Sequence, residues 1–330
     1  MKKIFALLLS AALLVTLLAA CGGGNTTDTD TDTQEPAADD STTQVEEQEP
    51  DTGDASKDDP LNQDEIGEKE LLVVSFGTSY NDSRRETIGA IEKAMQTAFP
   101  DYSVRRAFTS QIIIDHVKDR DGVTIDNVEQ ALERAVNNGV KTLVVQPTHL
   151  MNGLEYEELT DELAKYSDSF EKIAIGDPLL TSDADFEAVM TAITDATKDA
   201  ADGKTAICFM GHGTTADSNS VYSKMQTLLT DKGFNDYYVG TVEATPSLDD
   251  VLAAVQKGSY EKVVLRPLMI VAGDHANNDM AGDEDDSWKS TFEKAGYTVD
   301  CQVEGLGQLE AIQQLFVEHA KAAVASAEAE

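Results

Sequence analysis

The stretch Pro267-Leu-Met-Ile-Val-Ala-Gly-Asp-His-Ala-Asn-Asn-Asp-Met280 contains an apolar run that breaks off at Gly273-Asp274-His275 and continues into amides and carboxylates. Such a run is typical of a buried strand, and polar side chains that follow it lie where an open parallel sheet binds its ligands. The segments Met210-Gly-His-Gly-Thr214 and Thr241-Val-Glu-Ala-Thr245 have the same form. Together the three segments offer one candidate site, made of His212, Glu243 and His275.

Short β-branched runs alternate with longer helical patterns from Glu70 onward. This alternation predicts an α/β fold with parallel strands. The expected strands are residues 71–76, 102–108, 142–146, 172–175, 205–210, 236–241, 262–267 and 298–302. The expected helices are residues 84–99, 127–138, 155–166, 184–200, 219–232, 248–257, 287–295 and 309–325.

The two halves of this region resemble each other, which predicts an internal duplication. Phe76-Gly-Thr78 parallels His212-Gly-Thr214 at an offset of 136 residues. We therefore expect two similar doubly wound halves, each with a mainly parallel four-stranded sheet and flanking helices. A cleft between the carboxyl ends of their strands is the default ligand site. The halves are expected to span residues 70–200 and 201–330.

The candidate site has a two-histidine, one-carboxylate composition. His212, Glu243 and His275 are separated by 31 and 32 residues, which is one βα unit each time, so their side chains can converge. This set suits a divalent ion such as Co²⁺, Fe²⁺, Ni²⁺ or Zn²⁺ and leaves coordination positions open, whereas a structural zinc site would be closed. The alternative is that each histidine is a hydrogen-bonded loop residue and that the glycines beside His212 serve a tight turn.

The remaining histidines differ in their surroundings. His149 occupies the analogous loop of the first half, so we expect it to line the cleft. His319 stands at helical spacing from Ile312 and Phe316, which indicates a packing or surface role. His116 lies in a charged, helix-like segment and is expected at the surface.

The formal net charge is −36, which argues against a nucleic-acid partner because phosphate binding needs a basic face. The same charge raises the local concentration of cations, which suits a protein that handles metals. The acidic run Asp283-Glu-Asp-Asp286 fits either a solvated helix N-terminus or a patch that gathers metal ions.

The N-terminal residues have the pattern of an export signal. Lys2 and Lys3 precede the apolar segment Ile4–Leu18, which is followed by Leu18-Ala-Ala-Cys21. The apolar segment is too short for a stable membrane span. A cysteine directly after the small residues resembles the lipobox of bacterial lipoproteins. We therefore expect residues 1–20 to be a signal peptide and Cys21 to carry a lipid.

The segment after Cys21 is rich in Thr, Asp, Glu, Gln, Gly and Pro. Residues 21–69 are therefore expected to form an acidic, flexible linker. Linker and lipid would hold the protein at the outer face of the cell membrane, on its periplasmic or extracellular side. Cys208 and Cys301 both lie in strand-like runs, and whether they form a disulfide is left open.

Several motifs stand in a fixed order between about Leu71 and Glu318. They are Leu72-Val-Val-Ser-Phe-Gly-Thr-Ser-Tyr80, Arg106-Ala-Phe-Thr-Ser110, Asn152-Gly-Leu-Glu-Tyr-Glu157, Met210-Gly-His-Gly213, Val242-Glu243, Leu268-Met-Ile-Val-Ala-Gly-Asp-His-Ala-Asn-Asn-Asp-Met-Ala281 and Asp286-Ser-Trp-Lys289. Their sequence resembles the CbiK family, the anaerobic sirohydrochlorin cobaltochelatases, which belong with ferrochelatase to the class II chelatases. The long motif around Gly-Asp-His is highly specific.

The resemblance implies a bilobal enzyme that inserts a divalent metal into sirohydrochlorin or a related tetrapyrrole, as in cobalamin biosynthesis. The metal is a substrate, Co²⁺ first and Fe²⁺ or Ni²⁺ as alternatives, and no organic cofactor is implied. In the family, the residues that surround the metal fall on His212, Glu243 and His275. The two neutral imidazoles would bind the ion and accept protons, and Glu243 would balance charge.

Sirohydrochlorin carries eight carboxylates, so an acidic protein would need local cations to bind it. Arg106 is the candidate, with Arg105 beside it, and a structural ion pair is the alternative for each. Ser75 and His149 complete the expected substrate-binding residues.

The export signal is a departure from this pattern, since cobalt insertion normally takes place in the cytoplasm. A second hypothesis is therefore an exported tetrapyrrole- or metal-binding lipoprotein that serves haem or metal uptake. Turnover separates the two hypotheses. The oligomeric state, including a homo-oligomer, is left open.

Overall fold

Both halves of the protein are built on the same strand order. The computed structural model describes residues 51–329. The first sheet has the order β2-β1-β3-β4 and the second β6-β5-β7-β8, and all neighbouring strands are parallel. The strands are β1 (Lys69–Ser75), β2 (Ser103–Phe108), β3 (Thr142–Pro147), β4 (Lys172–Ile175), β5 (Thr205–Gly211), β6 (Tyr237–Thr241), β7 (Lys262–Pro267) and β8 (Thr298–Cys301). Every expected strand is confirmed to within two residues at its ends, and so is the predicted repetition of the halves.

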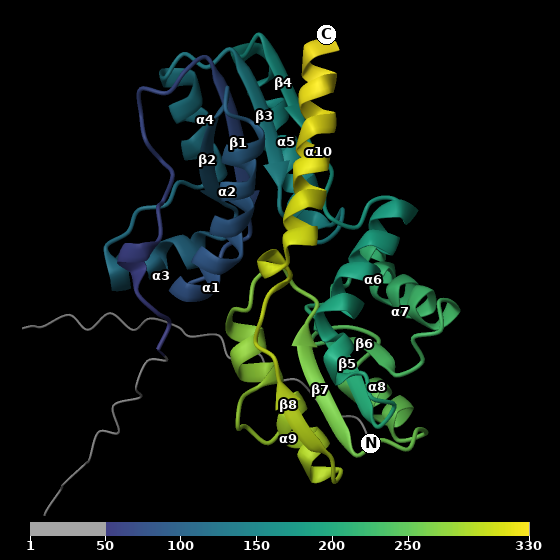
Figure 1. Cartoon of the computed structure of the whole chain (residues 1–330). Helices are drawn as coiled ribbons and strands as arrows, with labels where there is room; N and C mark the ends of the chain where they lie inside the picture. The colour runs from purple at the N-terminus through teal and green to yellow at the C-terminus, as the bar shows by residue number, and fades with distance from the viewer. Residues whose placement is uncertain (1–50, 330) are drawn as a thin grey trace, which may run out of the picture. The chain divides into compact units, whose positions relative to one another are not determined.

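Helices connect the strands and cover both sheets (Figure 1). Several begin with a capping box, in which a side chain at the helix start and the residue three positions later bond each other's backbone N–H. The helices are α1 (Asn81–Glu86), α2 (Ile88–Ala98), α3 (Gln111–Asp121), α4 (Val128–Asn137), α5 (Leu154–Ala164), α6 (Asp183–Thr197), α7 (Ser220–Asp231), α8 (Leu248–Val255), α9 (Trp288–Lys294) and α10 (Glu310–Ala329).

Two helix predictions were wrong. The expected helix 84–99 is divided into α1 and α2 at Thr87. Gly307 packs closely against Thr87 at this break, since a Cβ on residue 307 would lie 2.8 Å from the Thr87 Cβ. Helix α3 was not among the expected helices. Its boundary signals are nevertheless present, because Ser110 caps its first turn and Gly122 ends it with a left-handed φ of 70°.

The C-terminal helix α10 packs against the sheet of the first half. It contacts β3, β4 and α2 there, and it also contacts α6 (Figure 1). Its buried side chains, Ile312, Phe316 and Val317 among them, join a core cluster that includes residues of both sheets. Residues 310–329 therefore follow the second half in the sequence but pack on the sheet of the first half.

The free cysteines Cys208 and Cys301 lie on β5 and β8 of the second sheet. Strand β7 separates them, since Leu265 of β7 is the register partner of both residues. Two strand spacings come to about 10 Å, which exceeds the Cα separation that a disulfide spans.

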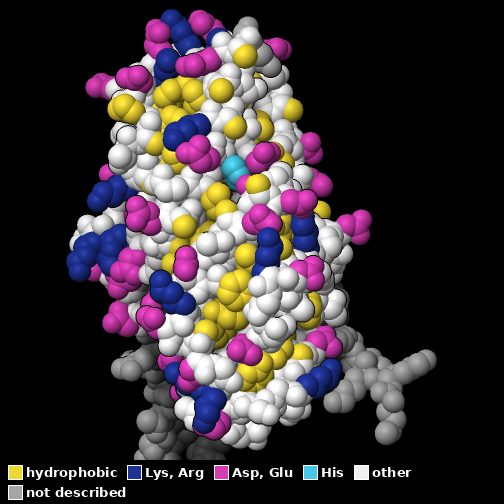
Figure 2. Space-filling view, turned by 45° about the vertical axis from the view of Figure 1, so that its right-hand side comes forward, with side chains coloured by type: hydrophobic (Ala, Val, Ile, Leu, Met, Phe, Trp, Pro, Cys, Tyr) yellow, Lys and Arg dark blue, Asp and Glu magenta, His cyan; other side chains and the backbone are white. Residues whose placement is uncertain are grey.

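Acidic side chains are scattered over the surface in Figure 2, in keeping with the net charge of −36. Residues 1–50 contain nine acidic and two basic residues, so most of the excess negative charge belongs to residues 51–330. Within residues 51–329, no helix has both the length and the apolar character that crossing a membrane requires.

Candidate functional site

The three predicted metal ligands follow three neighbouring strands of the second sheet. His212 follows β5, Glu243 follows β6 and His275 follows β7. Pairing between β5 and β6 continues past the strand ends, because the backbone N–H of Glu243 donates to the carbonyl of His212 at 2.9 Å. Adjacent parallel strands thus deliver the ligands to one edge of the sheet, as the spacing in the sequence predicted.

Gly213 allows the loop after β5 to approach the loop after β6. Its φ is +90°, and a Cβ at this position would lie 2.8 Å from the backbone nitrogen of Ala244. An L side chain would be strained by the φ and would push the two loops apart. The Gly-His-Gly motif therefore serves both a turn and the juxtaposition of His212 with Glu243.

The side chains of His212, Glu243 and His275 converge. One potential ligand atom from each residue lies within 4.8 Å of the others. Within residues 51–329, these three residues are the one group of three or more His, Cys, Asp or Glu side chains close enough together to hold a metal ion. His212 Nε2 is 3.8 Å from Glu243 Oε1. That separation is less than twice a metal–ligand bond of about 2.1 Å, so one ion can bridge the two atoms.

Hydrogen bonds leave Nε2 of each histidine free as a ligand. Nδ1 of His212 lies 2.8 Å from the carbonyl oxygen of Gly213, which can only accept, so Nδ1 carries the proton. Nδ1 of His275 lies 2.8 Å from the Asp279 carboxylate and donates to it in the same way. The two rings stand edge to face with their centroids 4.7 Å apart. Both imidazoles therefore present a lone pair toward the same space.

Asp279 is a candidate positioning residue that was not predicted from the sequence. It lies on a single π-helical turn, Ala276–Met280, that begins directly after His275. Carboxylates that accept from the second nitrogen of a ligating histidine fix its orientation and raise its basicity. The signal was present as a His-x-x-x-Asp spacing, which places both side chains on one helix face.

A cavity of about 400 Å³ adjoins this candidate metal site, and His212 and His275 are among its lining residues. Its walls come from the segments that follow β1, β3, β5 and β7, so the carboxyl ends of both sheets face it. Two contacts join the halves at this point: the backbone N–H of Ala272 donates to Ser83 Oγ at 3.0 Å, and Gly273 packs against Thr78. The predicted cleft between the halves is present.

Two of the predicted substrate-binding residues, Ser75 and His149, line this cavity. The hydroxyl of Ser75 is bonded to that of Thr148 at 2.7 Å. Both ring nitrogens of His149 are shielded from solvent and have no hydrogen-bond partner among the described residues. Burial lowers the pKa of His149 to about 4, so its ring is neutral at physiological pH.

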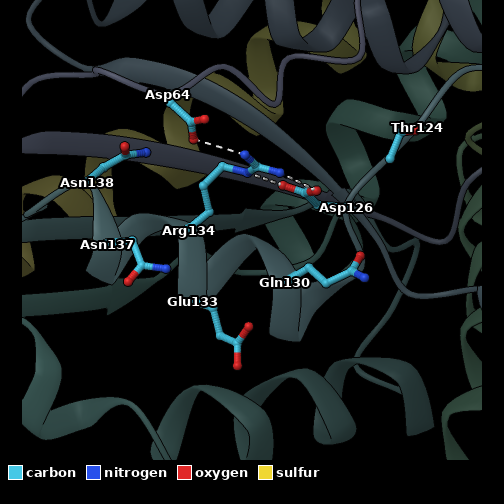
Figure 3. A pocket seen from close by; sticks show the side chains of 8 residues that line it. All are labelled: Asp64, Thr124, Asp126, Gln130, Glu133, Arg134, Asn137 and Asn138. Atoms are coloured by element: carbon cyan, nitrogen blue, oxygen red, sulfur yellow. Dashed lines mark hydrogen bonds and ion pairs between the residues drawn. The ribbon is translucent and has the colours of Figure 1, made fainter.

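A second, more polar depression of about 550 Å³ lies beside α4 (Figure 3). Arg134 crosses it and pairs with Asp126 at 2.7 Å and with Asp64 at 2.9 Å. Arg134 is thus held by two carboxylates, and the residues that line this depression contain no group of metal-ligating side chains that meets the geometry of the first site.

The prediction that Arg106 binds substrate was wrong. Its side chain is 1% exposed, it does not line the cavity, and its guanidinium pairs with Glu92 at 2.6 Å and with Asp58 at 2.7 Å. Arg105 is likewise buried and pairs with Asp126 at 3.0 Å. The alternative of a structural ion pair holds for both arginines.

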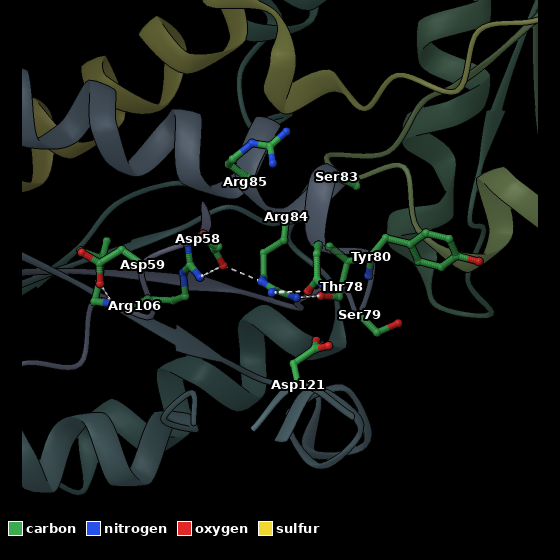
Figure 4. Close-up of polar contacts among 12 residues, drawn as sticks. Asp58, Asp59, Thr78, Ser79, Tyr80, Ser83, Arg84, Arg85, Arg106 and Asp121 are labelled. Atoms are coloured by element: carbon green, nitrogen blue, oxygen red, sulfur yellow. Dashed lines mark hydrogen bonds and ion pairs between the residues drawn. The ribbon is translucent and has the colours of Figure 1, made fainter. Parts of the chain in front are cut away.

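The predicted linker 21–69 extends too far. Asp58 is buried between Arg84 and Arg106, as Figure 4 shows, and Leu61 belongs to the hydrophobic core. Arg84 also donates to the carbonyl of Thr78, a cavity residue, at 3.1 Å. Residues 54–61 are therefore part of the folded first half, because a carboxylate and a leucine from this segment have partners there.

The other sequence predictions have mixed outcomes. Cys21 and the signal peptide lie outside the described residues. His116 is exposed on α3, as expected. His319 of α10 packs against α6, which agrees with its predicted packing role, and bonds the Asp185 carboxylate at 3.1 Å. In the acidic run, Asp283 pairs with Lys289 and Asp285 with Lys294, which fits the solvated helix start rather than a metal-gathering patch.

Residues 69–325 match the sequence profile of the family described as cobalt chelatase (CbiK). The chain belongs to this family. A sirohydrochlorin cobaltochelatase of Salmonella typhimurium is 38% identical over 251 residues, which cover 76% of this chain and 94% of that protein. Sirohydrochlorin cobaltochelatase CbiKC of Nitratidesulfovibrio vulgaris is 30% identical over 260 residues, which cover 78% and 91%.

Among solved structures, SirB from Bacillus subtilis with Fe³⁺ has the same fold as this CbiK-family chain. The TM-score is 0.57 at 14% sequence identity, with 80% of this chain and 98% of SirB covered. The predicted chelatase-like fold is thereby confirmed.

Proposed function

We propose that the protein is a sirohydrochlorin cobaltochelatase, which inserts Co²⁺ into the tetrapyrrole without an organic cofactor. Family membership and the names of the relatives support this activity. The observation that carries it is the convergence of His212, Glu243 and His275 at the edge of the cavity. Two imidazoles and one carboxylate leave coordination positions open, through which a divalent ion can pass to another ligand.

The exposure of the candidate ligands suits a metal ion that is bound briefly and then transferred to the tetrapyrrole. The side chains of His212 and Glu243 are 49% and 57% exposed, so a hydrated ion can reach them directly from solvent. A structural site would instead surround the ion with four protein ligands. The cavity beside the triad gives the tetrapyrrole a place from which its ring nitrogens can take over the ion.

Metal insertion also releases protons. The two pyrrole N–H protons must leave as the dication binds four ring nitrogens, so the macrocycle loses two positive charges as it gains two. An imidazole that releases the ion regains a free Nε2 lone pair and can accept one of these protons. Glu243 can balance the charge that passes through the site.

The test is metal insertion by the purified protein, followed through the absorption spectrum of sirohydrochlorin. We expect multiple turnovers with Co²⁺, and loss of nearly all activity in His212→Ala and His275→Ala without loss of the fold. His116→Ala, which changes an exposed histidine on α3, is the matched control and should keep wild-type rates. Parallel assays with Fe²⁺ and Ni²⁺ decide the metal preference.

Tight tetrapyrrole binding without turnover with any of the three ions would reject the chelatase proposal. That outcome would favour the second hypothesis, an exported binding protein for uptake of haem or metal.

We further propose that the protein is exported and anchored through a lipid on Cys21 at the outer face of the cell membrane. The charged start, the apolar segment and the small residues before Cys21 support this proposal. Cells grown with a labelled fatty acid should incorporate label into the wild-type chain and not into Cys21→Ser, which lacks the sulfur for thioether attachment. Label retained in Cys21→Ser would refute it.

A further inference from the structure

The cavity beside the metal site has a largely apolar wall. Its apolar side chains include exposed ones, of which Phe76 after β1 is 51% and Leu154 at the start of α5 is 54% exposed. Large apolar side chains that remain exposed around a concave site are typical of ligand-binding surfaces. A planar macrocycle can cover them with one face.

The same wall contains no lysine or arginine among the described residues that line it. Its carboxylate-bearing residues are Glu155 and Asp274. Arg120 touches the wall by donating to the carbonyl of Ser79 at 2.6 Å, but its guanidinium also pairs with Asp121 at 2.6 Å. Arg106, the residue expected to bind substrate carboxylates, is held between Asp58 and Glu92 away from the cavity.

Charge therefore opposes the binding of a polyanion at this site. A tetrapyrrole with eight carboxylates meets a wall whose charged side chains are Glu155 and Asp274, on a protein whose net charge is −36. Repulsion between like charges grows with the number of carboxylates and is screened by salt. A site that used lysine or arginine would show the opposite salt dependence, as in nucleic-acid binding.

We propose, on the basis of the chelatase function, that the protein holds its tetrapyrrole by the apolar ring face and leaves the peripheral carboxylates in solvent. Phe76 and Leu154 provide the contact surface. The site consequently prefers tetrapyrroles that carry fewer carboxylates, and sirohydrochlorin binds through its ring in spite of its charge. The substrate range is set by ring shape and apolar contact, without a requirement for eight carboxylates.

Two metal-free porphyrins form a matched pair of probes. Uroporphyrin has eight carboxylates, and coproporphyrin has the same ring with methyl groups in place of four acetates. Binding to the purified full chain is followed by porphyrin fluorescence between about 0.02 and 0.5 M KCl, where the Debye length falls from roughly 20 Å to about 4 Å. We expect coproporphyrin to bind about tenfold more tightly at the low salt concentration. The difference should shrink as salt strengthens uroporphyrin binding.

Tighter binding of uroporphyrin at low salt, weakened as KCl is added, would overturn the inference and would reveal a basic contact. The chelatase proposal would survive that result. If neither porphyrin nor sirohydrochlorin binds at any salt concentration, the proposed function fails and the inference fails with it.

A pair of variants tests the apolar contact directly. Phe76→Ala should weaken the binding of both porphyrins by a similar factor of about tenfold, because it removes contact with the ring face and does not change the charge. Val136→Ala, which changes an exposed valine on α4 outside the cavity lining, is the control and should leave both affinities unchanged. Unchanged affinities in Phe76→Ala would exclude this side chain as the contact surface.

Discussion

His275 owes its orientation to a single carboxylate, that of Asp279. This contact holds the proton on Nδ1, so Nε2 keeps its lone pair and can serve as a ligand atom beside His212 and Glu243. It is made within one π-helical turn, so the ligand and its partner are positioned by the same few residues.

Asp279→Asn should weaken Co²⁺ binding and slow metal insertion by about 10- to 100-fold, because the neutral amide accepts more weakly from Nδ1 and lowers the basicity of the ring. Titration of the protein with Co²⁺ and the insertion assay measure the two effects. The control is Asp283→Asn, which removes an exposed carboxylate before α9 and should change neither. Wild-type Co²⁺ affinity in Asp279→Asn would contradict the positioning role.

Glu70 on β1 is a buried carboxylate whose two oxygens have no hydrogen-bond partner among the described residues. Burial raises the pKa of its carboxyl group to about 7, although Arg105 lies 3.8 Å away and acts in the opposite direction. The folded protein therefore holds a proton here that the unfolded chain, with a pKa near 4.3, releases between about pH 4 and pH 7. In this window stability falls as the pH rises.

Glu70→Gln should remove this pH dependence, because the amide resembles the protonated acid. The wild type loses stability between about pH 5 and pH 8 and the variant does not. The difference in the free energy of unfolding, variant minus wild type, should therefore rise by about 2 kcal/mol over this range and remain constant above pH 8. Urea unfolding at several pH values measures the change. Glu68→Gln, which changes an exposed neighbour, is the control, and parallel pH profiles for all three proteins would refute the assignment.

The segment before β1 acts as a structural element. Asp58 joins Arg84 of α1 to Arg106 of β2, and Arg84 bonds the Thr78 carbonyl in the cavity wall. Burial by itself would raise the pKa of Asp58, but the hydrogen bonds and charges of Arg106 and Arg84 outweigh it and hold the pKa below its usual range. This segment therefore stabilises the first half and one wall of the cavity together.

Asp58→Asn should lower the free energy of unfolding by about 3 kcal/mol at pH 7, since it leaves Arg84 buried without its carboxylate. The loss should diminish as the pH falls through the lowered pKa of Asp58, where the wild type also loses the charge. Glu261→Gln breaks an exposed pair with Lys204 and should cost less than about 1 kcal/mol. Equal stability of the two variants in urea would show that the segment before β1 is not anchored.

Helix α10 joins the two halves of the protein. The helix follows β8 of the second half but packs on β3, β4 and α2 of the first. Phe316 is fully buried in a core cluster that also contains Ile207 and Val264 of the second sheet. The two halves are therefore expected to unfold as one cooperative unit.

Phe316→Ala should destabilise both halves by about 3–5 kcal/mol, because it opens a cavity in their shared core. Trp288, the single tryptophan, is buried in the second half, so its fluorescence reports that half while circular dichroism reports both. The urea transitions measured by Trp288 fluorescence and by circular dichroism should shift to lower urea by the same amount. Gln314→Ala, on the exposed side of the same helix, is the control, and a shift in the circular dichroism transition without a shift in Trp288 fluorescence would show that the halves unfold independently.

The strands and the three candidate metal ligands were predictable from the amino-acid sequence. Alternating strand and helix patterns placed all eight strands, because hydrophobic periodicity is a local property. The positions of His212, Glu243 and His275 followed from the same pattern, since successive parallel strands end at one edge of a sheet. Helix α3 was missed although Ser110 and Gly122 mark its ends, because only Ile114 and Val117 are buried among its mostly polar residues, so its helical pattern is short and weak.

Contacts between distant segments could not be predicted from the sequence and were seen only in the folded protein. Arg106 was expected to bind substrate, but Asp58 and Glu92 occupy its guanidinium. Residues 54–61 were expected in a linker and α10 in the second half, and both pack on the first. Such contacts depend on the packing of segments far apart in the chain, and a buried charge selects whichever opposite charge the fold brings to it. A local sequence pattern does not contain this information. The lack of lysine and arginine among the described residues that line the cavity could therefore be found only from the folded structure.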